Sequence, residues 1–519
     1  MPLSILIWCP LAFAVVGAFA SPRLTPRIVL GGSLITLGLA VYYLFAFDPH
    51  ATGLQFLTDE TWISVLGIHY KLGLDGLNLF LVALAALLSA AGIGAANLRE
   101  WDRPRLFYFQ FALAESAVLG AFCAQDLALF VVFFDLMLIP FYFLIGAWGG
   151  GPDRVRATMK LVIYTLVGSL FMLAAAIATG VLAGGQDHIT FVLSELQKVP
   201  LSRGSQEWIF LFFAAAFLVK MPAFPLHGWM PDGYRAMPLP VLAVFSAVLS
   251  KVGAYGFLRI VLPLYPDAAV HFQTLLLLIA LASILYGSIM AFTVTDARLV
   301  VGYSSVAQLG FITLGIFALN PQGAQGALLQ MVNHGLVTAA LFFIIALLAR
   351  RAGGSEDIRD MGGIAFRAPV LAALFLIVAL ATLAMPGSAN FVGEFYILLG
   401  VFNSKVAIAV IAFAGVVLAS VYVLRAFIRT MHGRVGPKVE SFDISLRDGL
   451  VLVPLVLVIL ALAVYPQLPL GRSETATKSS VRTAQAVANP PQRPGLVGPP
   501  TQQNAPQGTL PPQEQAPAP

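Results

Sequence analysis

Long continuous apolar runs, separated by short polar stretches, dominate this sequence. One of them reads WIFLFFAAAF and carries no charged or amide side chain over residues 208–217. A helix that crosses a bilayer needs about 20 mostly apolar residues, and about fourteen segments meet this requirement. Strands of a membrane barrel would alternate apolar and polar residues, which these runs do not. The predicted helices are centred near Leu11, Leu37, Ala83, Ser116, Asp135, Gly168, Ala215, Ser250, Ile279, Thr313, Ala340, Val378, Val416 and Leu457.

Two of the predicted helices are interrupted by a Met-Pro pair. The first interruption lies in LVKMPAFPLHGW and contains Pro222, Pro225 and His227, and the second lies in LAMPGSANFVGEF and contains Pro386 and Gly387. Proline removes an amide donor and breaks the helical ladder. At membrane depth, broken backbone occurs only where it is buried in protein or lines a cavity. These residues are therefore candidates for gating, although a proline can also simply kink a helix.

The predicted fold class is an all-α polytopic membrane protein with about fourteen transmembrane helices. Interrupted helices in corresponding positions are typical of inverted-topology repeats, here expected at roughly residues 107–262 and 271–432. Together they are expected to form one membrane domain over residues 1–470 with two discontinuous helices. Residues 471–519 are rich in Pro and Gln and are predicted to be a disordered tail.

Composition and charge support a membrane protein and exclude several other classes. The chain has 519 residues, of which 59% are hydrophobic and 11% charged, and the mean hydropathy is +0.87. The net charge of +5 comes from basic residues in the loops, so no nucleic-acid partner is expected. The two cysteines, Cys9 and Cys123, cannot hold an iron–sulfur cluster by themselves. No metal or cofactor site is predicted on this chain.

The basic residues also predict an orientation in the membrane. When loops are numbered by the helices that they join, nearly all Arg and Lys residues fall in the odd-numbered loops. By the positive-inside rule, these loops are cytoplasmic. With an even number of helices, both termini are expected on the outer side.

Ionisable residues interrupt six of the apolar helices. Such residues are costly inside a membrane, and they generally face a protein interior or a water-filled path and mark proton relays. The alternative is a set of structural ion pairs that lock helices together, but a series with charges of both signs favours a relay. The six residues are Glu115, Asp135, Lys220, Lys251, His334 and Glu394.

Five longer stretches carry a resemblance to a known family. They read FFDLMLIPFYFLIGAWGG, KMPAFPLHGWMPDG, LSKVGAYGFLRI, TDARLVVGYSSVAQLGF and MPGSANFVGEF. Together they resemble the antiporter-like proton-pumping subunits of bacterial respiratory complex I (NADH-quinone oxidoreductase). Within this family the chain is most similar to the chain M type, the counterpart of mitochondrial subunit 4. Glu394 stands where the sister chains typically have lysine, and the chain ends soon after the fourteenth predicted helix.

The resemblance implies a role for each buried ionisable residue. Asp135 corresponds to a fifth-helix glutamate that pairs with the seventh-helix lysine, here Lys220. Lys251 matches the eighth-helix lysine that connects the two halves. His334 matches a histidine of the central hydrophilic axis, and Glu394 matches the glutamate on the outlet side.

The sequence also departs from the family pattern. Glu115 agrees with the pattern and matches a fourth-helix glutamate of this chain type. Asp135 departs from it, because aspartate is one methylene shorter than the usual glutamate. A bridging water or a helix shift therefore has to compensate for the shorter reach toward Lys220. Gln308 stands where the family often has histidine, and glutamine cannot titrate. Tyr234 and Arg235 occupy a loop where the family has a histidine and a carboxylate.

The resemblance implies a membrane subunit of a proton-translocating NADH:quinone oxidoreductase in the bacterial cytoplasmic membrane. Quinone, flavin and iron–sulfur clusters would then lie on partner subunits, and the partners would be sister antiporter-like chains, small membrane subunits and the lipid bilayer. An alternative is a subunit of a multisubunit Na⁺/H⁺ antiporter, and another is a structural spacer that conducts nothing. A haem enzyme would need His227 or His334 as a ligand paired across helices, whereas isolated histidines are more often hydrogen-bonded structural groups or members of a relay.

Overall fold

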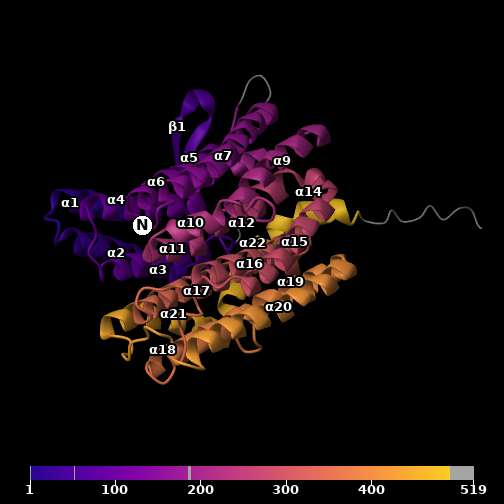
Figure 1. Ribbon diagram of the computed structural model, residues 1–519. Coiled ribbons are helices and arrows are strands. Elements are labelled where there is room, and N and C mark those ends of the chain that lie inside the picture. The colour runs from indigo at the N-terminus through magenta and orange to yellow at the C-terminus, as the bar shows by residue number, and fades with distance from the viewer. Residues whose placement is uncertain (1, 52, 185–188, 491–519) are drawn as a thin grey trace, which may run out of the picture.

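Helices make up most of the chain in the computed structural model, which describes residues 2–51, 53–184 and 189–490 (Figure 1). The long helices α16 and α17 lie between the N-terminal helices and the C-terminal helices α18 to α21. The helices are α1 (Leu3–Phe19), α2 (Thr25–Ala46), α3 (Leu79–Ala96), α4 (Pro104–Cys123), α5 (Leu127–Leu136), α6 (Leu138–Trp148), α7 (Arg154–Gly184), α8 (Leu193–Leu196), α9 (Arg203–Lys220), α10 (Met230–Ala236), α11 (Leu239–Val244), α12 (Ser250–Gly256), α13 (Leu262–Leu264), α14 (Pro266–His271), α15 (Gln273–Thr293), α16 (Ala297–Phe317), α17 (Pro321–Arg351), α18 (Pro369–Thr382), α19 (Ala389–Ser404), α20 (Val406–Met431), α21 (Leu446–Val464) and α22 (Gln467–Ala488).

The helical pattern agrees with a multi-pass membrane protein. Each of the predicted helix centres falls inside a helix. Within the described residues, 11 helical segments are long and apolar enough to cross a membrane, and the apolar helices α1 and α18 are shorter. A polytopic helical membrane protein is therefore confirmed, whereas the count of fourteen spans and the inverted repeats stay predictions.

The chain leaves the helical conformation at both Met-Pro pairs. Helix α9 ends at Lys220 and α10 begins at Met230, while α18 ends at Thr382 and α19 begins at Ala389. In the second gap Gly387 has a φ of +91°, which a residue with a side chain rarely adopts. The sequence did not predict a third interruption, at Met137 between α5 and α6.

The segment from Leu239 to Leu264 alternates between α- and π-helical turns. The two π-helical segments are Phe245–Leu249 and Phe257–Val261, and they flank α12 on both sides. A π-turn holds one extra residue and is frequent at functional sites. Lys251 lies in α12, between the two wider turns.

A β-hairpin corrects the all-α prediction. Strand β1 (Gln55–Ile63) pairs in antiparallel fashion with β2 (Ile68–Leu74), and the hairpin projects beside α5 (Figure 1). The turn is made by Ser64–Leu66 and by Gly67, which has a φ of +62°. The segment is too polar to span a membrane, and its Thr, Trp, Ile and Tyr residues favour strands.

Helix α22 corrects the predicted start of the disordered tail. The helix runs to Ala488, so residues 471–488 are helical, and the remainder from residue 491 lies outside the described residues. Its buried side chains recur every three or four positions, which is one face of a helix. They include Ser473, Thr477, Val481 and Ala484. The Pro- and Gln-rich composition begins only after this helix.

Helix α22 packs against both predicted halves of the domain. It contacts α13 and α14 on one side and α17 on the other. The hydroxyl of Ser480 donates to the Leu258 carbonyl (2.7 Å), and the amide of Gln325 in α17 donates to the Leu470 carbonyl (2.9 Å). The helix therefore spans the boundary between the halves.

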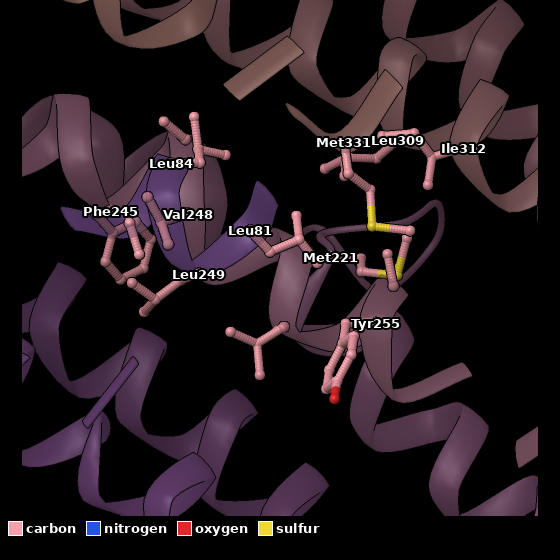
Figure 2. Close-up of a cluster of buried hydrophobic side chains, with 14 of the residues drawn as sticks. Leu81, Leu84, Met221, Phe245, Val248, Leu249, Tyr255, Leu309, Ile312 and Met331 are labelled. Atoms are coloured by element: carbon pink, nitrogen blue, oxygen red, sulfur yellow. The ribbon is translucent and has the colours of Figure 1, made fainter. Parts of the chain in front are cut away.

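Apolar side chains fill the centre of the domain, where helices from both halves meet (Figure 2). Leu81 and Leu84 of α3, Met221 after α9, and Leu309 of α16 are all buried there. Because this packing excludes water, a charge that crosses the centre needs polar side chains to carry it.

Candidate functional site

The first group of candidate residues lies where α9 ends. Lys220 is 7% exposed, and its ammonium donates to the Phe134 carbonyl at 3.5 Å and lies 4.3 Å from the centre of the Phe134 ring. A cavity of about 10 Å³ adjoins Lys220 and Met137, which is close to the lower limit for one water molecule.

The sequence implied that Asp135 and Lys220 pair only through a bridging water or a helix shift, and among the described residues their side chains form no direct ion pair. The two side chains interact electrostatically, and Asp135 also lies near Ser169 of α7. Among the described residues, however, the carboxylate is not within salt-bridge distance of Lys220, and its Oδ1 has no hydrogen-bond partner. The shorter side chain of aspartate explains the gap, as expected from the sequence.

The first helix break is held in place by contacts to α15 and α16. The Phe224 amide donates to the Ser283 hydroxyl (2.9 Å), and the His227 ring packs 4.8 Å from the ring of Tyr286. Trp229 anchors the break to α9 through its indole N–H, which donates to the Val219 carbonyl (3.0 Å). His227 is 8% exposed, so the turn that follows α9 is buried at this residue.

Lys251 is fully buried and lacks a carboxylate partner within the described residues. Its ammonium donates to the Ser246 carbonyl (3.3 Å) and to the Ser250 hydroxyl (3.2 Å), both on its own helix. His334 of α17 is the titratable group that interacts with it electrostatically. The imidazole Nε2 of His334 is bonded to the Thr338 hydroxyl at 3.0 Å.

Glu394 lies in a cluster of amide side chains between α16, α17 and α19. The Gln308 amide donates to its Oε1 at 2.8 Å, and the Gln330 amide approaches the same oxygen at 3.4 Å. The second carboxylate oxygen, Oε2, has no hydrogen-bond partner in the part of the chain that the structure describes. This residue follows the second helix break by little more than one turn.

Glu115 has its hydrogen-bond partner on the N-terminal helix α2. It is 2% exposed, and its Oε1 accepts a hydrogen bond from the Ser33 hydroxyl of α2 at 3.0 Å. Among the described residues, none of the six candidates forms an ion pair or hydrogen bond with another. Each has instead its own polar partners inside an apolar domain.

The sequence did not single out two amides that belong to this site. Gln330 lies three positions before Asn333 and four before His334, so that both are its neighbours on the surface of α17. The Asn333 amide donates to the Ala389 carbonyl at the start of α19 (2.7 Å). The signal was present as a polar stripe, QMVNH, on an apolar helix.

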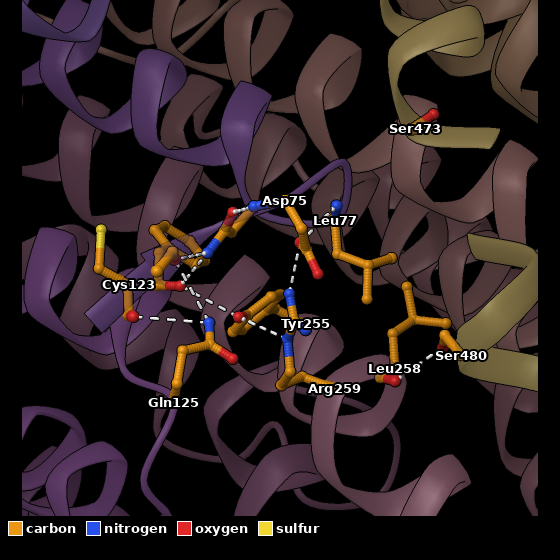
Figure 3. A network of polar contacts seen from close by, with 12 residues as sticks. Asp75, Leu77, Cys123, Gln125, Tyr255, Leu258, Arg259, Ser473 and Ser480 are labelled. Carbon is orange, nitrogen blue, oxygen red and sulfur yellow. Dashed lines mark hydrogen bonds and ion pairs between the residues drawn. The ribbon is translucent and has the colours of Figure 1, made fainter. Parts of the chain in front are cut away.

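A second polar network fixes the end of the segment that carries Lys251 (Figure 3). Arg259 donates to the Asp75 carboxylate (2.5 Å) and to the Tyr255 hydroxyl (2.9 Å). Tyr255 in turn donates to the Phe122 carbonyl of α4 (3.0 Å), which also accepts from the Asn78 amide (2.8 Å). The network anchors this segment to the start of α3 and the end of α4.

Ion pairs hold together the loops that are predicted to be cytoplasmic. Arg235 is exposed and pairs with Asp296 (3.1 Å), while Tyr234 is buried. Arg298 binds Glu356 and also donates to the Met237 carbonyl (2.5 Å). These contacts tie α10, which is helical where the sequence predicted a loop that departs from the family pattern, to the start of α16.

The loop that follows α17 carries a further ion pair, between Asp357 and Arg359. The Arg359 guanidinium donates to both oxygens of the Asp357 carboxylate, with a closest distance of 2.6 Å. This contact holds the pKa of Asp357 down at about 2. The carboxylate therefore stays ionised throughout the physiological pH range.

Comparison with known proteins defines the class of this chain. The profile of the family described as "NADH:quinone oxidoreductase/Mrp antiporter, TM" matches residues 124–420. NADH-quinone oxidoreductase subunit M of Rhodobacter capsulatus is 36% identical over 483 residues, which cover 90% of this chain and 93% of the relative. The chain belongs to this family of membrane subunits, as its motifs predicted.

Solved structures agree with this assignment. A chain of "Respiratory complex I from Thermus thermophilus with bound NADH" is 31% identical, with a TM-score of 0.85 over 94% of this chain and 100% of that chain. A chain of the "Mrp complex from Dietzia sp. DQ12-45-1b" is 21% identical, with a TM-score of 0.81 over 93% of this chain and 99% of that chain, and this likeness shows the fold alone.

Proposed function

We propose that this chain moves protons across the bacterial cytoplasmic membrane as a subunit of an NADH:quinone oxidoreductase. Quinone reduction elsewhere in the assembly drives the transfer, and the redox cofactors lie on partner subunits. The observation that carries the proposal is the series of ionisable residues, half-buried at Asp135 and buried at the others, each with separate polar partners, between two interrupted helices. Such a series is typical of a proton relay.

The proposed relay runs from Asp135 and Lys220 through Lys251 and His334 to Glu394. A change in the electrostatic interaction between Asp135 and Lys220 releases a proton from Lys220 toward Lys251. The electrostatic interaction between Lys251 and His334 supports the next step. Moving one charge against the membrane potential costs about 2.3 kcal/mol per 100 mV, so the relay has to be driven and closed at one end.

A multisubunit cation/proton antiporter is the second candidate function. The likeness to a chain of an Mrp complex favours it at the level of the fold, and a carboxylate such as Glu394 is a suitable ligand for Na⁺. An antiporter of this kind would change the internal pH only when Na⁺ is present. A proton relay would change the internal pH equally with and without Na⁺.

The experiment uses the intact assembly with Lys220→Ala, reconstituted in sealed vesicles. Quinone reduction and internal pH are recorded together, with and without Na⁺, and the exposed Lys198→Ala serves as the matched control. We expect coupled proton uptake to collapse in the Lys220 variant while the complex still assembles. Wild-type proton uptake and quinone reduction in that variant would overturn the relay and favour a structural spacer.

A further inference from the structure

The amide cluster around Glu394 treats the two carboxylate oxygens differently. Oε1 accepts a hydrogen bond from Gln308 at 2.8 Å, whereas Oε2 has no hydrogen-bond partner among the described residues. Glu394 is 3% exposed and Gln308 1%, so bulk water does not even out this difference. A buried carboxylate with one occupied and one free oxygen has a defined reactive side.

We propose that Gln308 is a positioning residue that fixes Oε2 of Glu394 as the oxygen that receives and releases the proton. This inference rests on the proposed function, because it assigns the atom at which the last relay step occurs. Gln308 cannot titrate, so its proposed role is to orient the carboxyl group of Glu394. The glutamine does not carry the proton, but its hydrogen bond to Oε1 directs protonation to Oε2.

Gln330 fixes the orientation of the Gln308 amide. Its Nε2 donates to Gln308 Oε1 at 2.8 Å, so the opposite end of the Gln308 amide, Nε2, points at the carboxylate. If the amide were turned over, its oxygen would face the carboxylate and its NH₂ would face another NH₂. The hydrogen bonds of these three side chains therefore run in one direction: Gln330 donates to Gln308, and Gln308 donates to Glu394.

A glycine allows Gln330 to lie this close to α19. A β-carbon at Gly393 would lie 2.5 Å from Gln330 Oε1 and 3.2 Å from its Cα. Any side chain at this position would push α17 and α19 apart. The arrangement thus depends on the backbone as well as on the amides.

The chemistry follows from the permanent donor character of an amide N–H. When the proton arrives, an O–H bond forms at Oε2 and the corresponding bond of the donor group breaks. Oε1 stays the carbonyl oxygen and keeps its hydrogen bond from Gln308. Protonation at Oε1 would instead place an O–H group against the amide N–H, and the hydrogen bond would weaken. No oxidant or reductant takes part.

The surroundings of the carboxylate contain few other titratable groups. Tyr422 of α20 interacts electrostatically with Glu394, and the Tyr422 hydroxyl is bonded to Ser304 at 2.9 Å. Gln308 and Gln330 supply the hydrogen bonds. The proposed asymmetry therefore depends on the amides and does not require a second charged group.

The test compares Gln308→Met with the wild-type complex in sealed vesicles. Methionine has a similar volume and cannot donate, so the carboxyl loses its hydrogen bond while the packing is kept. We expect the rate of proton transfer to fall about tenfold, the factor that one hydrogen bond to a charged group supplies. Thr313→Val is the matched control, because this buried hydroxyl on α16 donates to its own helix backbone.

A spectroscopic readout separates positioning from packing. In infrared difference spectra of the complex during turnover, the C=O band of protonated Glu394 is identified by its loss in Glu394→Gln. We expect this band to move to higher wavenumber in Gln308→Met, because the carbonyl oxygen loses its donor. Gln308→His, which restores an N–H donor, should bring back both the band position and the transfer rate.

The outcomes distinguish this inference from the proposed function. If Glu394→Gln abolishes proton transfer while Gln308→Met leaves rate and band unchanged, the positioning role is wrong and the relay stands. If Glu394→Gln itself transfers protons normally, the relay through this residue is wrong, and the positioning role falls with it. If Gln308→Met does not assemble, Gln330→Met is measured, and an unshifted band there overturns the inference.

Discussion

Replacement of Lys251 by methionine separates the stability of this protein from its transport activity. The side chain is fully buried, and within the described residues it has two neutral hydrogen-bond acceptors and no ion pair. Methionine is unbranched, fills a similar volume and carries no charge. The variant therefore removes the titratable group at the centre of the domain and little else.

The expected change in stability is small and can be favourable to the variant. Two hydrogen bonds from a charged donor stabilise by about 1.5–3 kcal/mol each, whereas taking an ammonium out of water costs several kcal/mol. Exchange of buried charges for apolar groups of similar size is neutral or stabilising by about 1–4 kcal/mol in other proteins. We expect Lys251→Met to be as stable as the wild type or up to about 3 kcal/mol more stable.

Transport should respond in the opposite way. With methionine at position 251, the path between Lys220 and His334 has no titratable group, so coupled proton transfer should fall to background. The assay combines the melting temperature of the purified complex with proton uptake in vesicles, and the exposed Lys405→Met is the control. A variant that melts well below the wild type, or one that pumps normally, would refute the reasoning.

Three further predictions concern single side chains. Asp135→Glu adds the missing methylene and should bring the carboxylate into direct contact with Lys220, which a structure of the variant would show; a persistent gap would mean that the backbone sets the distance. Gly253→Val should destabilise the complex by about 1–3 kcal/mol, because a β-carbon there would lie 2.9 Å from a carbonyl oxygen of α9. Gly253→Ala adds the same β-carbon without the branch, so its melting temperature should lie between those of the wild type and the valine variant, and equal melting temperatures of all three proteins would contradict the prediction. Asp357→Asn should lower thermal stability by the same amount at pH 5 and pH 8. The pKa of Asp357 is lowered to about 2 by Arg359, so its contribution is present above the unfolded pKa of about 4 and is lost only as the pH falls toward 2; a difference that shrinks at pH 5 would show that the pair titrates earlier.

The sequence predicted the helices and their interruptions because both depend on local features. Twenty apolar residues in a row leave few alternatives to a spanning helix, and Pro222 and Pro386 break the ladder wherever they stand. The motifs likewise identified the family. The interruption at Met137 has the same kind of signal in Pro140, because a proline there has no amide to donate to the Leu136 carbonyl four residues earlier. The prediction did not use this proline.

Other features depend on contacts between distant segments and could not be predicted in this way. The separation of Asp135 and Lys220 was suspected from side-chain length, but the actual partner of Lys220, the Phe134 carbonyl, depends on how α5 ends. The role of Gln330 depends on its distance to Gln308 across two helices. Helix α22 was assigned to a tail because its sequence is only weakly apolar. Its few apolar and small residues form a buried face only because α13, α14 and α17 provide a surface on which the helix packs.

Helix α22 connects the two halves of the domain through direct contacts to both. Near its start, the Leu470 carbonyl accepts a hydrogen bond from Gln325 of α17. Further along, the Ser480 hydroxyl donates to the Leu258 carbonyl in the other half. A connection of this kind resists the hinge-like rocking by which many carriers open alternately to the two sides of a membrane. In the proposed relay, protons and a few side chains would move while this frame of helices stays fixed.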